Sequence, residues 1–272
     1  MIDRITPIGF DDDVGIKINI YGRSGTGKTT LWSTFPAPIL AIVCSGGKNP
    51  GEIRSIDTPE NRKRISQMVI SSTDDLRDVL VYQAKKEPYA TVVLDHASGL
   101  QDLVIMEYLG LDEIPLSLYR KAGRGESWSL VSRQGYGQIA NEMKEMLRRL
   151  LSLRCNVSIV AQEREFNNDN EESMVLPYVG SALTPSIVGW LNPACDYICQ
   201  TYIRQCTREK TVKVGKKTVK KQIAIKGVDY CLRTAPDPTF TTKFRLPRGV
   251  VLPDCIVDPS YDKIMALIRG GR

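Results

Sequence analysis

The residues with the clearest chemical potential form a glycine-rich octet near the start of the chain, Gly22-Arg23-Ser24-Gly25-Thr26-Gly27-Lys28-Thr29. The octet fits the pattern G-x-x-x-x-G-K-[ST], in which glycines let backbone N–H groups point inward at phosphate oxygens. Lys28 can reach the β- and γ-phosphates of ATP, and the Thr29 hydroxyl can bind Mg²⁺. We therefore predict a site for ATP and Mg²⁺ whose cradle consists of Gly22, Arg23, Ser24, Gly25, Thr26, Gly27, Lys28, Thr29 and Thr30.

The segments on either side of the octet have the patterns that such a loop requires. Residues 16–21 alternate in the manner of a β-strand, and residues 29–35 predict a helix that ends at Pro36. The alternative is a chance glycine turn. Strand, loop and helix in this order favour the phosphate-binding interpretation, because the helix directs its positive end at the same anion.

A second candidate group ends the apolar run of residues 90–95. Asp95 would lie at the carboxyl edge of its strand, where open α/β sheets bind ligands, and could hold Mg²⁺ together with Thr29. Alternatively, Asp95 caps the following helix. His96 is the only histidine of the chain. It could contact the γ-phosphate or position water, but we favour a supporting role outside the chemistry.

A third candidate, Gln162, follows the apolar run of residues 157–161. An amide at that edge of the sheet can contact the γ-phosphate or the attacking water and report its presence to the next segment. We expect that segment, residues 163–180, to be a polar and acidic loop. The predicted catalytic residues at this edge of the sheet are therefore Lys28, Asp95 and Gln162.

The elements that must position these residues alternate along the chain. Short apolar runs alternate with helical patterns, which favours an α/β fold with a mostly parallel, twisted central sheet and helices on both faces. Further strands are expected at residues 39–43, 65–70 and 196–204, helices at 73–83, 139–151 and 261–269, a loop at 45–64, and a C-terminal β-hairpin at 211–219 around Gly215. We expect one domain, with a core at about residues 14–203 and an extension at about 204–272.

The composition narrows the class of protein. The 272 residues are 42% hydrophobic, which is enough for a core. No apolar run approaches the roughly 20 residues of a membrane span, and the first residues lack the apolar centre of a secretory signal. Seven scattered cysteines without a C-x-x-C pair indicate free, buried thiols rather than zinc ligands. These features predict a cytoplasmic protein without a membrane partner.

Basic residues are unevenly placed, although the net charge is only +6. Nine of them lie between Arg204 and Lys226, opposed only by Glu209, and a second basic and aromatic segment spans residues 111–137. Such segments suit single-stranded DNA. A solvated hairpin and an active-site lid are the respective alternatives. The candidate DNA contacts are Arg120, Lys121, Arg124, Trp128, Arg133, Lys213, Lys216, Lys217, Lys220 and Lys221.

The order of these parts resembles the RecA-like P-loop ATPase core. More closely, it resembles the phage AAA-type nucleotide-binding proteins that include Sak-type single-strand annealing ATPases. The likeness rests on residues 21–30, 160–163, 232–237 and 242–245, and it covers about residues 14–250. It implies ATP hydrolysis between neighbouring subunits of a ring or filament, with DNA-facing loops at residues 111–135 and 163–180.

The resemblance also implies roles for individual residues. Gln162 becomes the nucleotide-sensing glutamine, and Lys243 and Arg245 become candidates for a basic finger that reaches a neighbour's γ-phosphate. Ordinary exposed charges on a strand are the alternative for Lys243 and Arg245. One departure is that residues 43–47 contain no acid, where such recombinases usually carry a catalytic glutamate. Glu52 or Glu163 could replace it; otherwise ATP would act mainly as an assembly switch.

These features lead to three hypotheses about function. We expect a phage-type ATPase that oligomerises on single-stranded DNA in the host cytoplasm and promotes annealing or strand pairing, with a single-strand-binding protein as a further candidate partner. The alternative is an ATP-dependent switch or loader that acts on a protein partner in DNA replication with little turnover. A small-molecule kinase is disfavoured, because the sequence has no compact arginine-rich lid linked to an acceptor pocket. The acidic residues of the segment 163–180 would repel DNA at that loop.

Overall fold

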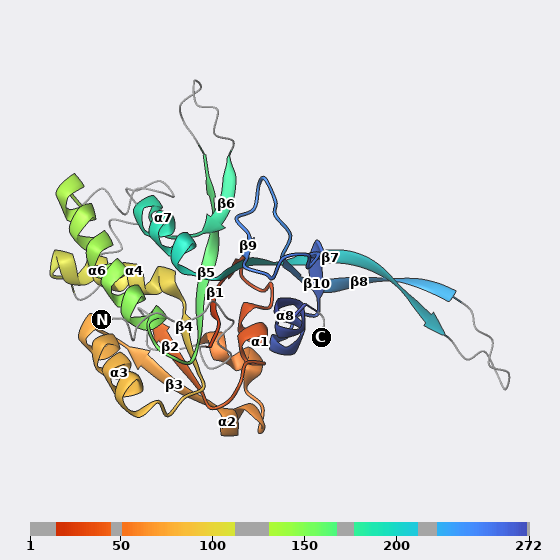
Figure 1. The fold of residues 1–272 in the computed structure, drawn as a ribbon, viewed down its shortest axis with the longest axis horizontal. Helices are drawn as coiled ribbons and strands as arrows, with labels where there is room; N and C mark the ends of the chain where they lie inside the picture. Colours follow the sequence, from red (N-terminus) through yellow and green to blue (C-terminus); the bar gives the residue numbers. More distant parts are fainter. Residues whose placement is uncertain (1–14, 45–50, 112–130, 168–176, 212–221, 271–272) are drawn as a thin grey trace.

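The computed structural model describes residues 15–44, 51–111, 131–167, 177–211 and 222–270. A twisted ten-stranded sheet forms its centre, in the order β10-β8-β7-β1-β5-β4-β2-β3, with β6 beside β5 and β9 beside β7 (Figure 1). The parallel strands are β1 (Lys17–Gly22), β2 (Ile39–Cys44), β3 (Ile65–Ile70), β4 (Thr91–Asp95), β5 (Asn156–Phe166) and β7 (Tyr197–Thr211). The antiparallel additions are β6 (Tyr178–Ser181), β8 (Gln222–Arg233), β9 (Lys243–Phe244) and β10 (Cys255–Val257).

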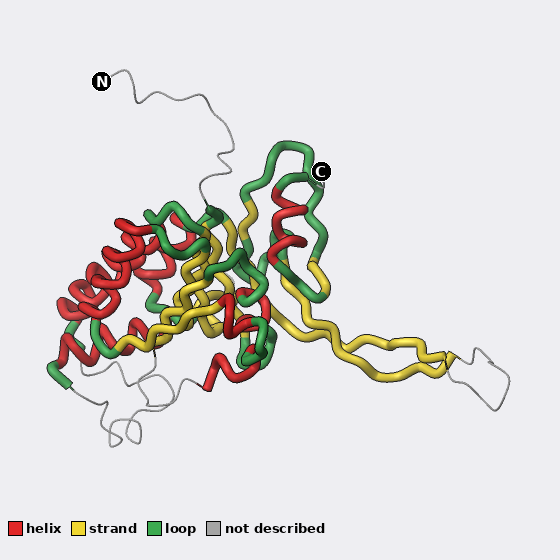
Figure 2. The backbone as a smooth tube through the Cα atoms, turned by 90° about the horizontal axis from the view of Figure 1, so that it is seen from below, coloured by secondary structure: helices red, strands yellow, loops and turns green. Residues whose placement is uncertain are grey.

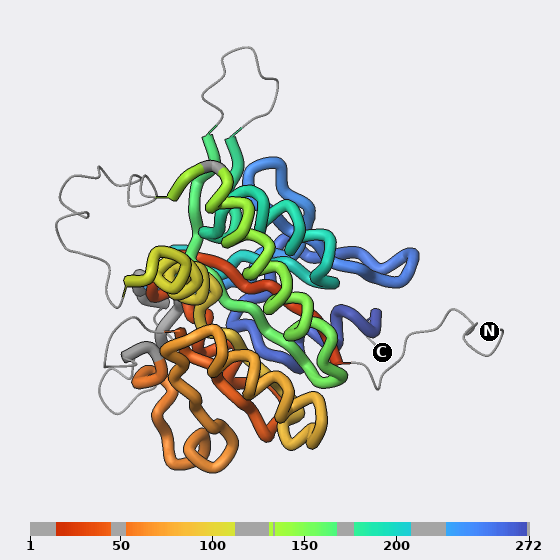
Figure 3. Tube along the Cα trace, turned by 90° about the vertical axis from the view of Figure 1, so that its left-hand side faces the viewer, coloured from red at the N-terminus to blue at the C-terminus, as the bar shows by residue number. Residues whose placement is uncertain are grey.

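Helices cover both faces of this sheet, as the alternating sequence pattern predicts. One layer contains α3 (Thr73–Lys86), α4 (Ala97–Leu109), α6 (Arg133–Leu151) and α7 (Pro185–Ala194), and Figure 3 looks onto it. The other layer contains α1 (Lys28–Trp32), the 3₁₀ helix η2 (Gly51–Ile56), α2 (Asn61–Arg64) and α8 (Tyr261–Ile268). Each layer has its own cluster of buried apolar side chains against the sheet. The predicted α/β fold class is therefore confirmed.

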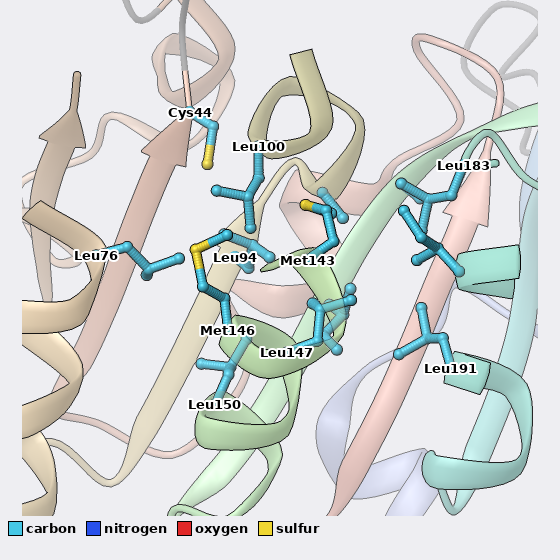
Figure 4. Close-up of a cluster of buried hydrophobic side chains, with 14 of the residues drawn as sticks. Cys44, Leu76, Leu94, Leu100, Met143, Met146, Leu147, Leu150, Leu183 and Leu191 are labelled. Atoms are coloured by element: carbon cyan, nitrogen blue, oxygen red, sulfur yellow. The ribbon is translucent and has the colours of Figure 1, made fainter. Parts of the chain in front are cut away.

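The larger core cluster depends on the apolar stripe of α6. Met143 and Leu147 are fully buried, and Met146 and Leu150 are almost so. Figure 4 shows these side chains between Leu76 on one side and Leu183 and Leu191 on the other, with Leu94 and Leu100 close beside them. The helical spacing of the stripe predicts this burial, because residues three and four apart share one face.

The hairpin of β7 and β8 is longer than expected. The two strands pair antiparallel from Gln200 and Arg233 out to Thr211 and Gln222, and they project from the body as a two-stranded arm (Figures 1 and 2). The expected strand end at residue 204 is therefore wrong, while the predicted turn around Gly215 lies outside the described residues. Residues 205–211 are too polar to show the apolar pattern of a buried strand. Their strand is stabilised by backbone hydrogen bonds to β8.

Two expected loops also contain regular structure. Strand β5 continues past Gln162 to Phe166 and pairs with β6. The two ends of the expected loop over residues 163–180 are therefore the paired strands of one hairpin. The Phe166 and Tyr178 rings stack with centroids 4.8 Å apart, which gives these polar strand ends an apolar contact. Residues 45–64, expected as a loop, contain η2 and α2.

The cysteines agree only in part with the predicted free, buried thiols. All seven are free, and Cys44, Cys195, Cys199 and Cys231 are buried, whereas Cys155, Cys206 and Cys255 are only partly buried. Burial raises the pKa of Cys195 to about 12, which is consistent with an unreactive thiol. Within the described residues, no helix is both long enough and apolar enough to cross a membrane.

Candidate nucleotide-binding site

The glycine loop connects the end of β1 to the start of α1, at the carboxyl edge of the parallel strands. Gly22 must lack a side chain, because a Cβ there would lie 2.4 Å from the Thr201 hydroxyl and carbonyl oxygens of β7. The loop is closed by Thr26, whose hydroxyl lies 2.7 Å from that of Thr201 and donates to the Arg23 carbonyl. Gly27 caps α1 with a φ of 90°, and no side chain caps the helix or places an acid in its first turn. An anion therefore meets no competing carboxylate in this turn.

A cavity of about 650 Å³ opens beside the loop. Its wall brings together the predicted residues Lys28, Thr29, Asp95 and Gln162, which come from α1, β4 and β5. The remaining loop residues on the wall are Ser24, Gly25, Thr26, Gly27 and Thr30. Cavities of this size hold a whole small-molecule ligand rather than a single ion.

Lys28 lies inside the loop, with 8% of its surface exposed. Its ammonium donates to the carbonyl oxygens of Gly22 and Arg23 over 2.7 Å each, and to Oε1 of Gln162 over 3.3 Å. These three acceptors are uncharged, so the hydrogen bonds place no negative charge against the ammonium. A phosphate oxygen at the same place would supply the opposite charge.

Asp95 is buried at the end of β4, on the same wall. Burial raises the pKa of its carboxyl, while the hydrogen bond from Trp32 and the neighbouring His96 and Lys28 act in the opposite direction. The indole N–H of Trp32 donates to Oδ2 over 2.9 Å. Because a cation favours the ionised form of a buried acid, and Thr29 adds a hydroxyl to the same cavity, this donor set fits Mg²⁺.

His96, rather than Asp95, caps the helix that follows β4. Its Nδ1 accepts a hydrogen bond of 2.8 Å from the backbone N–H of Gly99 in α4. The alternative that Asp95 is the cap is therefore wrong, which leaves its carboxylate to face the cavity. His96 lies on the cavity wall as well, in addition to its capping role.

Gln162 stands directly beside the loop because β5 pairs with β1. Their register places Gln162 opposite Gly22, and the carbonyl of Gln162 accepts from the backbone N–H of Ala182, just after β6. The side chain that contacts Lys28 therefore belongs to the residue at which β5 leaves the parallel sheet and enters the β5–β6 hairpin.

A chain of polar contacts leads from the loop to the base of the β7–β8 hairpin. Nε of Arg23 donates to Glu163 over 2.6 Å, and Nε2 of Gln200 donates to the same carboxylate over 3.0 Å. Oε1 of Gln200 in turn accepts from Nε of Arg233 over 3.1 Å. Arg233 also pairs with Asp237, and its guanidinium stands 4.3 Å from the Phe240 ring centroid. Glu163, one of the two acids considered as a catalytic base, is thus held by Arg23 and Gln200.

The predicted finger residues lie elsewhere in the chain. Lys243 on β9 donates to the carbonyls of Asn192, Pro193 and Cys195, at the end of α7. Arg245 pairs with Asp196 over 2.6 Å, and its side chain is 57% exposed. Neither residue lines the cavity of its own chain, and their role as fingers stays a prediction.

The predicted DNA contacts lie mostly outside the described residues. This holds for Arg120, Lys121, Arg124 and Trp128, and for Lys213, Lys216, Lys217, Lys220 and Lys221. Arg133 begins α6, but its side chain, like that of Glu52, is outside the described part of the structure. These residues stay predictions.

Several residues of the site were not found by sequence reasoning. Ser55, Tyr230, Asp258 and Pro259 line the cavity from distant segments, and no local motif marks them. Trp32 is different, because it follows the octet by three residues and is fully buried. A tryptophan one turn after a phosphate loop could have been recognised as a partner for a nearby carboxylate, since a buried indole N–H needs an acceptor.

Three comparisons with known proteins were made, and one of them identifies a family. A family model described as an AAA domain matches residues 14–246. A search of curated proteins gives no match. Among solved structures, the crystal structure of the RadB recombinase is similar, with 17% sequence identity over 69% of this chain and 74% of that chain and a TM-score of 0.37. Because the family model covers most of the chain and includes the glycine loop, Asp95 and Gln162, the chain belongs to the AAA domain family, and it is a P-loop nucleotide-binding protein of the α/β class.

Proposed function

We propose that this protein is a Mg²⁺-dependent ATPase that oligomerises on single-stranded DNA and promotes annealing or strand pairing. The observation that carries the ATPase part is the convergence of Lys28, Thr29, Asp95 and Gln162 on one cavity beside the glycine loop. These four residues supply a cation, two metal ligands and an amide at neighbouring positions. Phosphoryl transfer needs little more from a protein, because it depends on positioning and on charge neutralisation.

Each of these four side chains has a separate role in the proposed reaction. Lys28 exchanges its carbonyl acceptors for phosphate oxygens, which neutralises part of the triphosphate charge. Thr29 and Asp95 would hold Mg²⁺, which supplies further charge neutralisation when bound. Gln162, already within hydrogen-bonding distance of Lys28, orients the attacking water or the γ-phosphate. Because Gln162 begins the β5–β6 hairpin, its displacement would alter that hairpin.

The proposal includes a contribution from a neighbouring subunit. Lys243 and Arg245 lie two residues apart at β9, where contacts to the end of α7 and to Asp196 fix them. The guanidinium of Arg245 remains largely exposed and could reach an adjacent cavity in a ring or filament. A cation supplied from outside the chain would make hydrolysis depend on assembly.

The DNA part of the proposal is supported by the β7–β8 arm and its sequence. The arm projects from the body, and the sequence that joins its two strands contains Lys213, Lys216, Lys217, Lys220 and Lys221 (Figure 2). A cationic segment of this kind binds a polyanion by releasing its counterions, so the affinity falls as the salt concentration rises. The polar chain from Arg23 to Arg233 offers a physical link between this arm and the phosphate loop.

A salt titration tests the DNA part. Filter binding of a labelled single-stranded oligonucleotide, with ATP and Mg²⁺ present, should show a log–log salt slope that becomes shallower when these five lysines are replaced by alanine. The slope should change by about 0.7 for each phosphate that the lysines no longer neutralise. Replacing Lys85 and Lys86 on α3 with alanine removes positive charge away from the arm and serves as the control. Equal slopes for the five-lysine variant and the wild type would refute the proposed DNA surface.

A second function, an ATP-dependent switch or loader, is favoured by one specific observation. Glu163 is engaged by both Arg23 and Gln200 and does not line the cavity. Residues 43–47 contain no acid either. The lack of an available carboxylate as catalytic base at these two places argues against rapid hydrolysis. Phosphate release with and without single-stranded DNA separates the two functions. Negligible turnover in both conditions, together with a conformational change on ATP binding, would favour the switch.

A further inference from the structure

One part of the cavity wall has no role in phosphate chemistry. Tyr230 on β8, and Asp258 and Pro259 between β10 and α8, line the same cavity as Lys28 and Asp95. An aromatic ring and a carboxylate are poor partners for a triphosphate, because one offers no positive charge and the other repels it. The chemistry of this wall therefore suits an uncharged, partly apolar portion of the ligand.

Tyr230 stands against the phosphate loop itself. A Cβ built on Gly27 would lie 3.2 Å from Cδ1 of the Tyr230 ring, so the ring lies against the backbone at the start of α1. The residue is 41% exposed, so the rest of the chain leaves part of it uncovered. Its position is fixed by the cross-strand pairing with Ile203 and by the backbone N–H of Asp258, which donates to the Tyr230 carbonyl over 2.8 Å.

Asp258 is held beside this ring by its backbone. The residue adopts a φ of 47°, and its carbonyl, like that of Val257, accepts from Nζ of Lys263 over 2.8 Å. The following residues are anchored too, because the backbone N–H of Tyr261 donates to the hydroxyl of Thr34, just after α1. The exposed residue Asp258 thus has its backbone held in place at the cavity wall.

We propose that Tyr230 and Asp258 form the nucleobase subsite of this cavity, with Tyr230 stacking on the base and Asp258 accepting from an exocyclic amino group. The ring offers a π-face close to the loop that would hold the phosphates, and aromatic rings stack readily on any base. Asp258 adds selectivity, because a carboxylate accepts from the amino group of adenine but repels the carbonyl that replaces it in hypoxanthine. This subsite rests on the proposed triphosphate site, and it determines which nucleoside triphosphate the site prefers.

The test compares a probe that carries a base with one that does not. Calorimetric titration with ATP and with inorganic tripolyphosphate, both with Mg²⁺, is carried out on the wild type, Tyr230→Ala and Tyr230→Phe. Tyr230→Ala should weaken ATP binding about fivefold or more while leaving tripolyphosphate binding unchanged, since one stacking interaction contributes at least a factor of about five. Tyr230→Phe keeps the ring and should bind ATP within about threefold of the wild type.

The controls separate this subsite from the phosphate site. Tyr82→Ala removes a similarly exposed tyrosine from α3 and should change neither affinity. Lys28→Ala should weaken both probes, and its failure to do so would contradict the phosphate site rather than the base subsite. If Tyr230→Ala weakens both probes equally, or neither, the nucleobase subsite is wrong.

Asp258 is tested by the choice of base. The wild type should bind ATP more tightly than inosine triphosphate, and Asp258→Ala should remove that preference without weakening tripolyphosphate binding. Equal affinity of the wild type for the two nucleotides, or an unchanged preference in the variant, would overturn the role of Asp258. Thermal unfolding of each variant checks that the exposed substitutions leave the fold intact.

Discussion

The indole N–H of Trp32 donates a hydrogen bond to Oδ2 of Asp95 over 2.9 Å, which joins the helix after the phosphate loop to the acidic strand β4. Both residues are buried, so the contact replaces water as the partner of the carboxylate. The geometry of the proposed Mg²⁺ site therefore depends on a side chain that has no direct part in metal binding.

Burial of Asp95 predicts a conflict between stability and activity. Asp95→Asn keeps an acceptor for Trp32 but removes a buried charge, so it should abolish Mg²⁺-dependent turnover and raise the free energy of unfolding at neutral pH. The expected gain is on the order of 1 kcal/mol, typical of stabilising single substitutions. Urea unfolding measures it, with the exposed Asp78→Asn as the control.

The pH dependence of this gain follows from the raised pKa of Asp95. The folded protein binds this proton more tightly than the unfolded chain, so the ionised group destabilises the fold above its folded pKa. As pH falls through that pKa toward the unfolded value, the wild type regains stability and the difference from Asp95→Asn shrinks. A difference that grows on acidification would contradict the assigned environment.

Gln162 should affect turnover more than binding. Gln162→Ala leaves Lys28 with its two carbonyl partners but removes the amide proposed to orient water, so the turnover rate should fall about 100-fold. The Kd of ATP should stay within about threefold of the wild type. Steady-state kinetics and calorimetry separate the two effects, with Gln67→Ala on β3 as the matched control. A large loss of affinity with normal turnover would show that the amide has been misassigned.

Glu163 should behave as an ion-pair partner rather than a catalytic base. Arg23 is largely exposed, with 83% of its side chain accessible, so the coupling energy in a double-mutant cycle with Glu163 should be at most about 1 kcal/mol. Glu163→Gln should retain turnover within about threefold of the wild type. Loss of turnover with nucleotide binding intact would instead identify Glu163 as the base.

A cavity in the core around α6 should lower the free energy of unfolding. Leu147 is fully buried among side chains of the sheet and the neighbouring helices, and Leu147→Ala should lower the free energy of unfolding by about 2–5 kcal/mol (Figure 4). Asn141→Ala, on the exposed face of the same helix, should change it by less than about 0.5 kcal/mol. Chemical denaturation of the two variants provides the comparison. Similar losses in both would mean that α6 does not pack as described.

Much of the fold could be predicted because its signals are local. A continuous apolar run marks strand β4, and a period-3.6 pattern marks helix α6. Ser72 marks the start of α3, where it forms a capping box with Asp75. Helix α7 was not predicted, since it is apolar on most sides and contains Pro193. The sequence does not predict the outer part of β7, because its polar residues are held by cross-strand pairing that has no local signature.

The residues of the site also fall into those that local sequence patterns predict and those that only distant contacts bring to the cavity. Lys28 and Thr29 follow from a motif, and Asp95 and Gln162 follow from apolar runs that end in a polar residue. Tyr230 and Asp258 reach the cavity only through the pairing of β8 with β7 and the anchoring of the segment before α8. Contacts between such distant parts of the chain are set by topology, which sequence patterns specify only in part.

The most direct test of the account is calorimetric titration of the wild type and Lys28→Ala with a non-hydrolysable ATP analogue and Mg²⁺. We predict saturable binding to the wild type, and a loss of affinity of at least about tenfold in a variant that unfolds at a similar temperature, because Lys28 meets the ligand rather than the apolar core. Lys85→Ala on α3 should bind as the wild type does. A folded Lys28→Ala protein with unchanged affinity, or a wild type that binds no nucleotide, would contradict a nucleotide site at the glycine loop.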